Sequence, residues 1–149
     1  MGECDLVWRR RYGHRVPNVT LIPSDSLAAT PGYAYASAIE AGARIIHLAG
    51  ACPLDVGGTI GPVGDFAGQA VRCVENMITA LTEAGGTLVD IAYTRVLVAS
   101  AKTEDLGAVW SVIRHAFADH EVPSTLLGVT VLGYENQLVE IEAVAAVAA

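Results

Sequence analysis

The chain has 149 residues, 52% of them hydrophobic and 17% charged, which suits one domain with a buried core and is too apolar for a disordered chain. A formal net charge of −7 argues against nucleic acid as a partner, because phosphate binding needs a basic surface. No apolar run reaches the roughly 20 residues of a membrane-spanning helix, since charges such as Glu40 and Arg44 interrupt each run. We therefore expect neither a nucleic-acid partner nor a membrane partner.

Residues 1–31 are predicted to form an N-terminal arm, because prolines and mixed charges punctuate them. Within this arm, Val19–Ile22 is a candidate strand. The arm also carries a basic cluster, which fits a solvated tail better than a contact with an anion. The cluster consists of Arg9, Arg10, Arg11 and Arg15. Residues 32–149 are predicted to form the single folded domain.

The domain begins with two apolar segments, residues 33–39 and 44–48, separated by a turn at 40–43. This pattern predicts a β-hairpin. The glycine-rich stretch 55–64 that follows is predicted to be a loop. It lacks the GxGxxG pattern and the lysine of a P-loop, so we do not expect it to hold a phosphate.

Two helices are predicted, because apolar residues recur at steps of three and four over 65–84 and over 103–120. Asp65 is suited to cap the first helix, and Gly85 to end it in the left-handed conformation. Thr103 is the expected cap of the second helix. Pro123 forbids its continuation.

Three further strands are predicted at 91–99, 126–132 and 138–148. The first is apolar on both faces apart from Arg95, as expected for an interior strand. The predicted order is β-β-α-β-α-β-β, an α+β fold. Two helices can cover only one face of such a sheet. The other face, rich in Val, Ile and Leu, would be exposed unless copies of the chain cover it, so we expect an oligomer.

The three cysteines, Cys4, Cys52 and Cys73, are scattered and show no CxxC spacing. An odd count of unpaired thiols is typical of a reducing compartment, and the N-terminus has no apolar signal segment, so we expect a cytoplasmic location. The four histidines form no ligand pattern with the cysteines. We expect no metal and no cofactor.

The last strand places a carboxylate, Glu140, among apolar residues. Because side chains alternate along a strand, Glu140 and Glu142 should share one face, opposite Val139 and Ile141. One interpretation is a solvated face on which a glutamate reaches Arg95. The other is a cleft in which Glu140 positions or activates a water molecule. The spacing alone favours neither.

Several short motifs follow one another in an order shared with a known family. They are Gly32-Tyr33, Ala49-Gly50-Ala51-Cys52-Pro53-Leu54-Asp55, Gly68-Gln69, Glu75-Asn76, Leu81-Thr82-Glu83-Ala84-Gly85, Pro123 and Val139-Glu140-Ile141-Glu142-Ala143-Val144-Ala145. Together they resemble the RidA/YjgF family over residues 32–148. The combination of Gln69, seven residues before Asn76, with the terminal Val-Glu-Ile-Glu-Ala segment is specific, although each motif alone would be weak.

The resemblance implies a chorismate-mutase-like fold, a mixed sheet with two helices on one face, assembled as a homotrimer with ligand clefts between subunits. It implies hydrolysis of reactive enamine or imine acids, such as 2-iminobutanoate and 2-iminopropanoate, to 2-keto acids and ammonia. Glu140 matches the family's water-positioning glutamate, and Tyr33 matches a tyrosine that lines the cleft. The further substrate-binding candidates are Thr125, Ala49, Cys52 and Leu127.

One departure from the family is that Thr125 stands where an arginine usually grips the substrate carboxylate. A neutral hydroxyl replaces a permanently charged fork. Arg95, Arg72 and Arg114 are candidates to replace it, although the latter two are expected to face solvent from helices. A deaminase with a divergent cleft is therefore one hypothesis, and a non-catalytic small-ligand-binding or chaperone-like trimer is the alternative. A ribonuclease is the least favoured, because the chain is acidic. Cys52 as a nucleophile is also disfavoured, because no histidine is placed to activate it.

Overall fold

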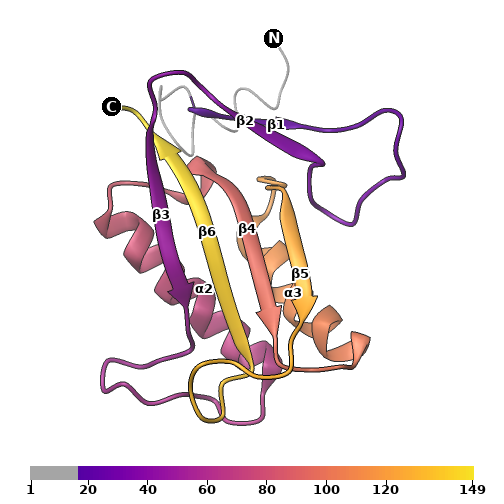
Figure 1. Ribbon diagram of the computed structural model, residues 1–149, viewed down its shortest axis with the longest axis vertical. Coiled ribbons are helices and arrows are strands. Elements are labelled where there is room, and N and C mark those ends of the chain that lie inside the picture. The colour runs from indigo at the N-terminus through magenta and orange to yellow at the C-terminus, as the bar shows by residue number, and fades with distance from the viewer. Residues whose placement is uncertain (1–16) are drawn as a thin grey trace.

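Four strands in the order β3-β6-β4-β5 make the main sheet of the structure, a computed structural model that describes residues 17–149 (Figure 1). The strands are β3 (Arg44–Ala51), β4 (Ile91–Val98), β5 (Ser124–Gly128) and β6 (Val139–Val147). β6 is antiparallel to β3 and β4, whereas β4 and β5 are parallel, so the sheet is mixed. The prediction that residues 91–99 form an interior strand is confirmed.

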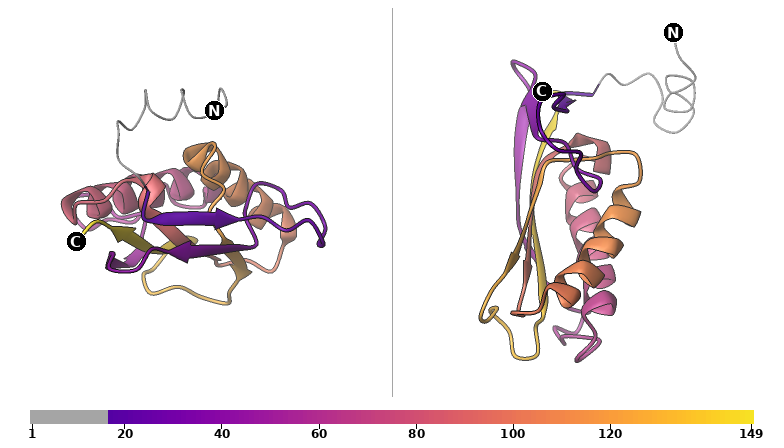
Figure 2. Two further views of the ribbon diagram at one scale, coloured as in Figure 1. Left: turned by 90° about the horizontal axis from the view of Figure 1, so that it is seen from above. Right: turned by 90° about the vertical axis from the view of Figure 1, so that its right-hand side faces the viewer.

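Two helices, α2 (Phe66–Glu83) and α3 (Thr103–Phe117), pack on one face of this sheet (Figure 2). A short 3₁₀ helix, η1 (Leu88–Asp90), connects α2 to β4. The helices and the inward side chains of the strands enclose the core, which includes Met77, Leu81, Val96, Ile113 and Ile141. Burial of each such side chain contributes about 1.5–3 kcal/mol. The predicted α+β architecture, with both helices on one side, is confirmed.

The ends of the helices follow their sequence signals in part. Asp65 caps α2 by accepting a hydrogen bond from the Gly68 N–H, and Gly85 has the left-handed φ of 88° expected after a helix. α3 starts at Thr103, but Lys102 is its N-cap and makes no side-chain capping bond, so the prediction of a Thr103 cap is wrong. α3 ends at Phe117 rather than near His120, because Ala118 adopts a positive φ of 49°.

The predicted hairpin between residues 33–39 and 44–48 is also wrong. β2 (Ala36–Ile39) instead pairs antiparallel with β1 (Val19–Ile22), in a separate two-stranded sheet. This small sheet lies across one end of the main sheet (Figures 1 and 2). Val19 packs there against Ala92 and Ala146, and the Ser37 hydroxyl donates to the Ala92 carbonyl at 2.6 Å. β3 is thereby left to pair over most of its length with β6.

The strand at Val19–Ile22 is confirmed, whereas the arginine cluster at residues 9–15 lies outside the described residues. β5 begins at Ser124 and ends at Gly128 instead of spanning 126–132. The earlier start matters for function, because it places Thr125 inside a strand rather than in a loop before it.

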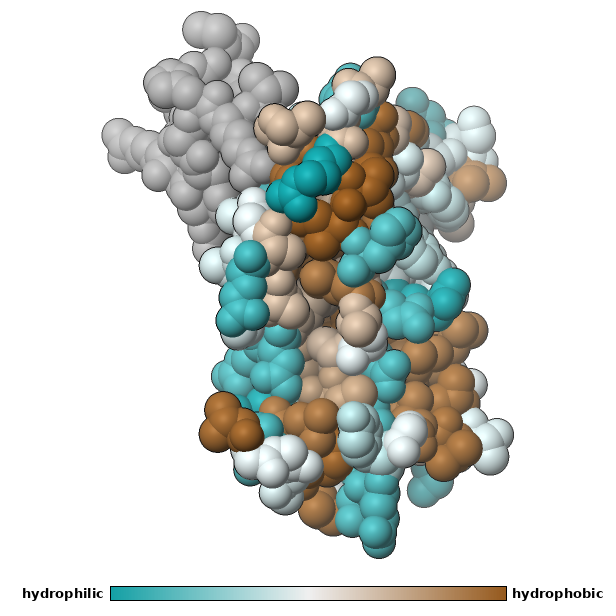
Figure 3. Space-filling model, turned by 60° about the vertical axis from the view of Figure 1, so that its left-hand side comes forward, coloured by the Kyte–Doolittle hydropathy of each residue, from teal (hydrophilic) through white to brown (hydrophobic). Residues whose placement is uncertain are grey.

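The face of the main sheet opposite the helices, here called the outward face, is less apolar than predicted. Leu127 and Ile45 are exposed there, but so are Arg95 and His47, and Glu142 is half-buried. Figure 3 shows hydrophobic patches separated by hydrophilic residues on the side of the molecule that includes β3. The alternation predicted for the last strand is confirmed, since Val139 and Ile141 are buried while Glu140 and Glu142 are partly exposed.

Candidate functional site

Glu140 lies near the start of β6 and is held by two hydrogen-bond donors. Its Oε2 atom accepts from Gln137 Nε2 at 2.9 Å and from the Cys52 thiol at 3.4 Å. Gln137 is almost fully buried, and its side-chain Oε1 accepts from the Tyr134 N–H at 3.1 Å. The carboxylate is therefore oriented by a side chain that is itself fixed. We call Glu140, Cys52, Gln137 and Gly50 the Glu140 cluster.

Gly50 lets the backbone of β3 approach this carboxylate. The pairing of β3 with β6 shifts register between Leu48 and Ala51, which places Gly50 in an irregular segment of the strand. A Cβ atom on Gly50 would overlap with Oε1 and the other terminal atoms of Glu140. Only glycine fits here without displacing the carboxylate.

Two amide side chains of α2 support the segments that flank Glu140. Gln69, fully buried, donates to the carbonyls of Pro62 and Asn136 at 2.9 Å and accepts from the Leu138 N–H at 2.7 Å. Asn76 donates to the carbonyls of Cys52 and Leu54 at 2.8 and 2.9 Å. These bonds satisfy buried backbone groups. They explain why the sequence motif has amide side chains at Gln69 and Asn76.

The Cys52 thiol is a hydrogen-bond donor rather than a nucleophile in this setting. Burial, followed by the negative charge of Glu140 and the hydrogen bond to it, raises the pKa of Cys52 to about 11. The thiol therefore remains protonated at neutral pH. Burial likewise raises the pKa of Cys73, whose Sγ donates to the Val139 carbonyl at 3.4 Å.

Thr125 and Leu127 share the outward face with Glu140 but stand two strands away. Leu127 is aligned with Leu97 of β4, which is aligned with Glu140, so the two residues at the ends of this row are roughly 10 Å apart at adjacent-strand spacings of about 4.8 Å. Thr125 lies one row further along, and its Oγ1 accepts from the Tyr93 hydroxyl at 2.7 Å. In this second row, Arg95 of β4 lies between Thr125 of β5 and Glu142 of β6.

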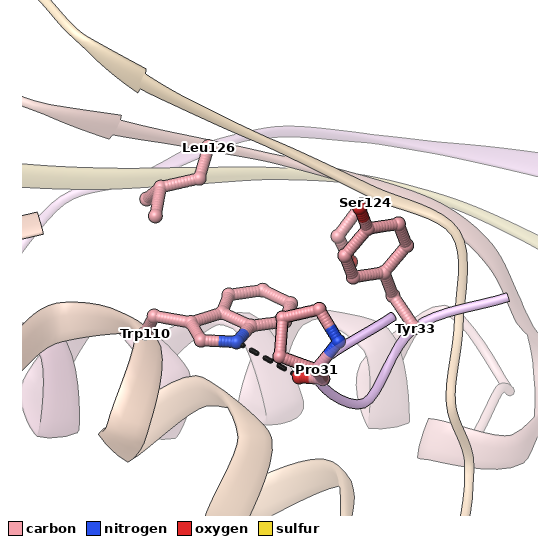
Figure 4. Close-up of a pocket in the computed structure, with 5 residues that line it drawn as sticks. All are labelled: Pro31, Tyr33, Trp110, Ser124 and Leu126. Carbon is pink, nitrogen blue, oxygen red and sulfur yellow. Dashed lines mark hydrogen bonds between the residues drawn. The ribbon is translucent and has the colours of Figure 1, made fainter. Parts of the chain in front are cut away.

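Tyr33 lies on the opposite side of the sheet. With Pro31, Trp110, Ser124 and Leu126 it lines an open cavity of about 260 Å³ between the chain before β2, α3 and β5 (Figure 4). Its ring contacts Trp110 edge-on, with centroids 6.1 Å apart, and Trp110 Nε1 donates to the Pro31 carbonyl at 3.1 Å. Within one chain, Tyr33 and Glu140 do not meet.

Of the residues proposed from the sequence, the structure thus brings Cys52 to Glu140, with Ala49 exposed in the adjoining irregular segment of β3. The sequence reasoning missed Gln137, which binds Glu140 directly. No local signal marked it, because residues three apart in an extended strand are about 10 Å apart and point to opposite faces. The contact depends on the loop before β6, where Gln69 bonds to the backbone of Asn136 and Leu138.

Within residues 17–149, no group of three or more His, Cys, Asp or Glu side chains is placed to hold a metal ion. In that same part of the chain, none of the helices has the length and apolar composition needed to span a membrane.

Solved structures from three organisms share this fold. The Rid-family protein YyfB from Yersinia pestis is 23% identical and matches with a TM-score of 0.81, covering 87% of this chain and 99% of that chain. Rv2704 from Mycobacterium tuberculosis, a member of the YjgF/YER057c/UK114 family, is 29% identical with a TM-score of 0.60 and the same coverage. RidA from an Antarctic Psychrobacter is 21% identical with a TM-score of 0.63, covering 86% and 99%.

No curated protein shows a significant match to the chain. The family model described as Endoribonuclease L-PSP, in contrast, matches residues 25–147, from the segment before β2 to the last residue of β6. Together with the solved Rid and YjgF structures, this match shows that the chain belongs to the RidA/YjgF family.

Proposed function

We propose that this protein is a small-molecule enzyme that hydrolyses reactive imine or enamine acids, of the 2-iminobutanoate and 2-iminopropanoate type, to 2-keto acids and ammonia. The observation that carries the proposal is the Glu140 carboxylate, which is partly exposed on the outward face and fixed by Gln137 and Cys52. A fixed carboxylate beside solvent is suited to orient a water molecule and to accept its proton.

The reaction needs only proton transfers that one carboxylate can perform. Glu140 takes a proton from water as the water oxygen bonds to the C=N carbon, and the proton passes to the nitrogen. The new hydroxyl then gives its proton to Glu140, which passes it to the amino group. The C–N bond breaks as the carbonyl forms, ammonia leaves, and Glu140 is again a carboxylate. One water is consumed and one ammonia is released, so no redox partner is required.

The neighbours of Glu140 have assigned roles in this proposal. Oε2 is occupied by the Gln137 and Cys52 bonds, and Oε1 lies toward Gly50. Oε1 is therefore the oxygen that holds the water. The Cys52 thiol, with its pKa raised to about 11, donates a hydrogen bond to the carboxylate throughout and does not attack the substrate.

The test is ammonia release from freshly generated 2-iminobutanoate or 2-iminopropanoate. Glu140→Gln should reduce kcat by about 10²- to 10⁴-fold, the usual contribution of a general base. Gly50→Ala should reduce it as well, because the new Cβ displaces the carboxylate. The matched control is Gly107→Ala, since a Cβ on Gly107 meets nothing within 4 Å. If the wild-type protein does not exceed the buffer rate, the deaminase proposal is wrong.

A second candidate function is binding of a small ligand without turnover. It is favoured by Thr125, whose hydroxyl is neutral and already accepts from Tyr93. A thermal-shift screen separates the two candidates, because a pure binder is stabilised by a ligand that is recovered unchanged.

The proposal includes a homotrimer with ligand clefts between subunits, in the cytoplasm and without nucleic acid. Its support within one chain is that Tyr33 and Glu140 lie on opposite sides of the sheet, so that only a neighbouring subunit can bring both to one ligand. Light scattering that shows a monomer would contradict this part of the proposal.

A further inference from the structure

Among the described residues 17–149, one ion pair crosses the outward face, one row from Glu140. Arg95 of β4 binds Glu142 of β6, with Nη1 to Oε2 at 2.9 Å, and both side chains are more than two-fifths exposed. The Cα partner of Arg95 on its other side is Thr125 of β5. The guanidinium is therefore anchored beside the position where the family carries its arginine.

The other arginines of residues 17–149 are engaged elsewhere. Arg44 donates to the Ala84 carbonyl at the end of α2, and Arg72 pairs with Glu75 on the same helix. Arg114 of α3 covers Gly32, where a Cβ would overlap with its side chain. Within this described part, Arg95 is the only arginine on the outward face. The other charged or titratable groups there include Tyr93, His47, Glu140, Glu142 and the Cys52 thiol that donates to Glu140.

We infer that Arg95 is the substrate-binding residue that replaces the missing arginine, and that Glu142 competes with the substrate carboxylate for it. The inference rests on the proposed function in that it places the substrate over the same outward face as Glu140. An exposed ion pair in water contributes little stability. Exchanging the Glu142 carboxylate for a substrate carboxylate on the same guanidinium therefore costs little.

The register also limits the length of the substrate. Arg95 is aligned with Glu142, and Glu140 lies two residues further along β6, so the Cα atoms of Arg95 and Glu140 are diagonal neighbours about 7–8 Å apart. A substrate that binds Arg95 through its carboxylate and meets a water on Glu140 is therefore a short anion, with its reactive carbon close to its carboxylate.

The first experiment measures binding rather than turnover, with 2-oxobutanoate and its neutral amide as probes in titration calorimetry. Arg95→Gln should weaken 2-oxobutanoate binding roughly tenfold, because a charge-assisted bond is lost, and should leave amide binding unchanged. Glu142→Gln should tighten 2-oxobutanoate binding, because it removes the competitor. A structural role for the pair would make both variants weaker alike, and that result would overturn the inference.

The second experiment moves the charge across the strand pair. Thr125→Arg in the Arg95→Thr background should restore 2-oxobutanoate binding, since the two positions are direct neighbours. The control is Arg72→Gln, which breaks an ion pair of similar exposure on α2 and should change nothing. Failure of the wild-type protein to bind 2-oxobutanoate also overturns the inference.

Failure of the two proposals can be told apart. If Arg95 controls 2-oxobutanoate binding but no ammonia is released from imines, the binding residue stands and the deaminase assignment falls. If ammonia is released equally by wild type and Arg95→Gln, with unchanged KM, the deaminase assignment stands and the role of Arg95 falls.

Discussion

The outward face of the sheet carries two polar groupings that are held in different ways. In the Glu140 cluster, both partners of the carboxylate are held by further bonds. The Gln137 side chain accepts from the Tyr134 N–H, the Cys52 carbonyl accepts from half-buried Asn76, and buried Gln69 bonds to the residues on either side of Gln137. Within one chain, the Arg95–Glu142 pair is more than two-fifths exposed on both side chains. A buried network specifies one geometry, whereas an exposed ion pair exchanges partners at small cost. The Glu140 cluster is therefore suited to fixed chemistry, and the Arg95–Glu142 pair is suited to exchange its carboxylate for that of a substrate.

The largest expected effect comes from breaking the buried support of the Glu140 cluster. Gln69→Ala removes three hydrogen bonds to backbone groups, and each buried group left without a partner costs about 1–3 kcal/mol. We expect the free energy of unfolding to fall by about 3 kcal/mol or more in urea denaturation. Glu83→Ala, at an exposed position on the same helix, is the control. A decrease in the free energy of unfolding of less than about 1 kcal/mol for Gln69→Ala would show that the Gln69 hydrogen bonds do not hold the segments beside Glu140 in place.

A smaller effect is expected on the reactivity of Cys52. With its pKa raised from 9.0 to about 11, the thiolate fraction at pH 8 is about a hundredfold below that of an ordinary cysteine, and iodoacetamide should alkylate it correspondingly slowly. Because the folded pKa exceeds the unfolded one, stability should also fall as pH rises from 9 through 11.

Mass-spectrometric peptide mapping would follow Cys52 separately from the other cysteines, with the urea-unfolded chain as the reference. Glu140→Gln should speed the alkylation, because the neighbouring negative charge is gone. Equal rates for folded and unfolded chains would show that Cys52 is not held against the carboxylate.

The smallest effect is expected for the exposed pair. A double-mutant cycle of Arg95→Ala and Glu142→Ala should give a coupling energy of about 0.2–1 kcal/mol in denaturation, as for other solvent-exposed ion pairs. Added salt should reduce it further. A coupling of several kcal/mol would show that the Arg95–Glu142 pair is held as firmly as the Glu140 cluster, and the contrast between the two groupings would be wrong.

Local patterns predicted most of the elements. The three-and-four spacing of apolar residues located both helices, and alternation assigned the two faces of β6 correctly. The hairpin prediction failed because two apolar segments separated by a turn can pair with each other or with other strands, and the sequence pattern is the same in both cases. β2 pairs with β1, and β3 pairs with β6, which lies about 100 residues later in the sequence. Pairing energy depends on those distant partners, which no local pattern contains.

Residue types at fixed spacings were enough to predict the family, the α+β class and Glu140 as the candidate catalytic carboxylate. They did not predict that Cys52, Gln137 and Gly50 meet this carboxylate, or that Arg95 stands beside Thr125 with Glu142 as its partner. These contacts depend on strand register, which aligns residues far apart in the chain, and a shift of one residue would turn each of these side chains to the other face.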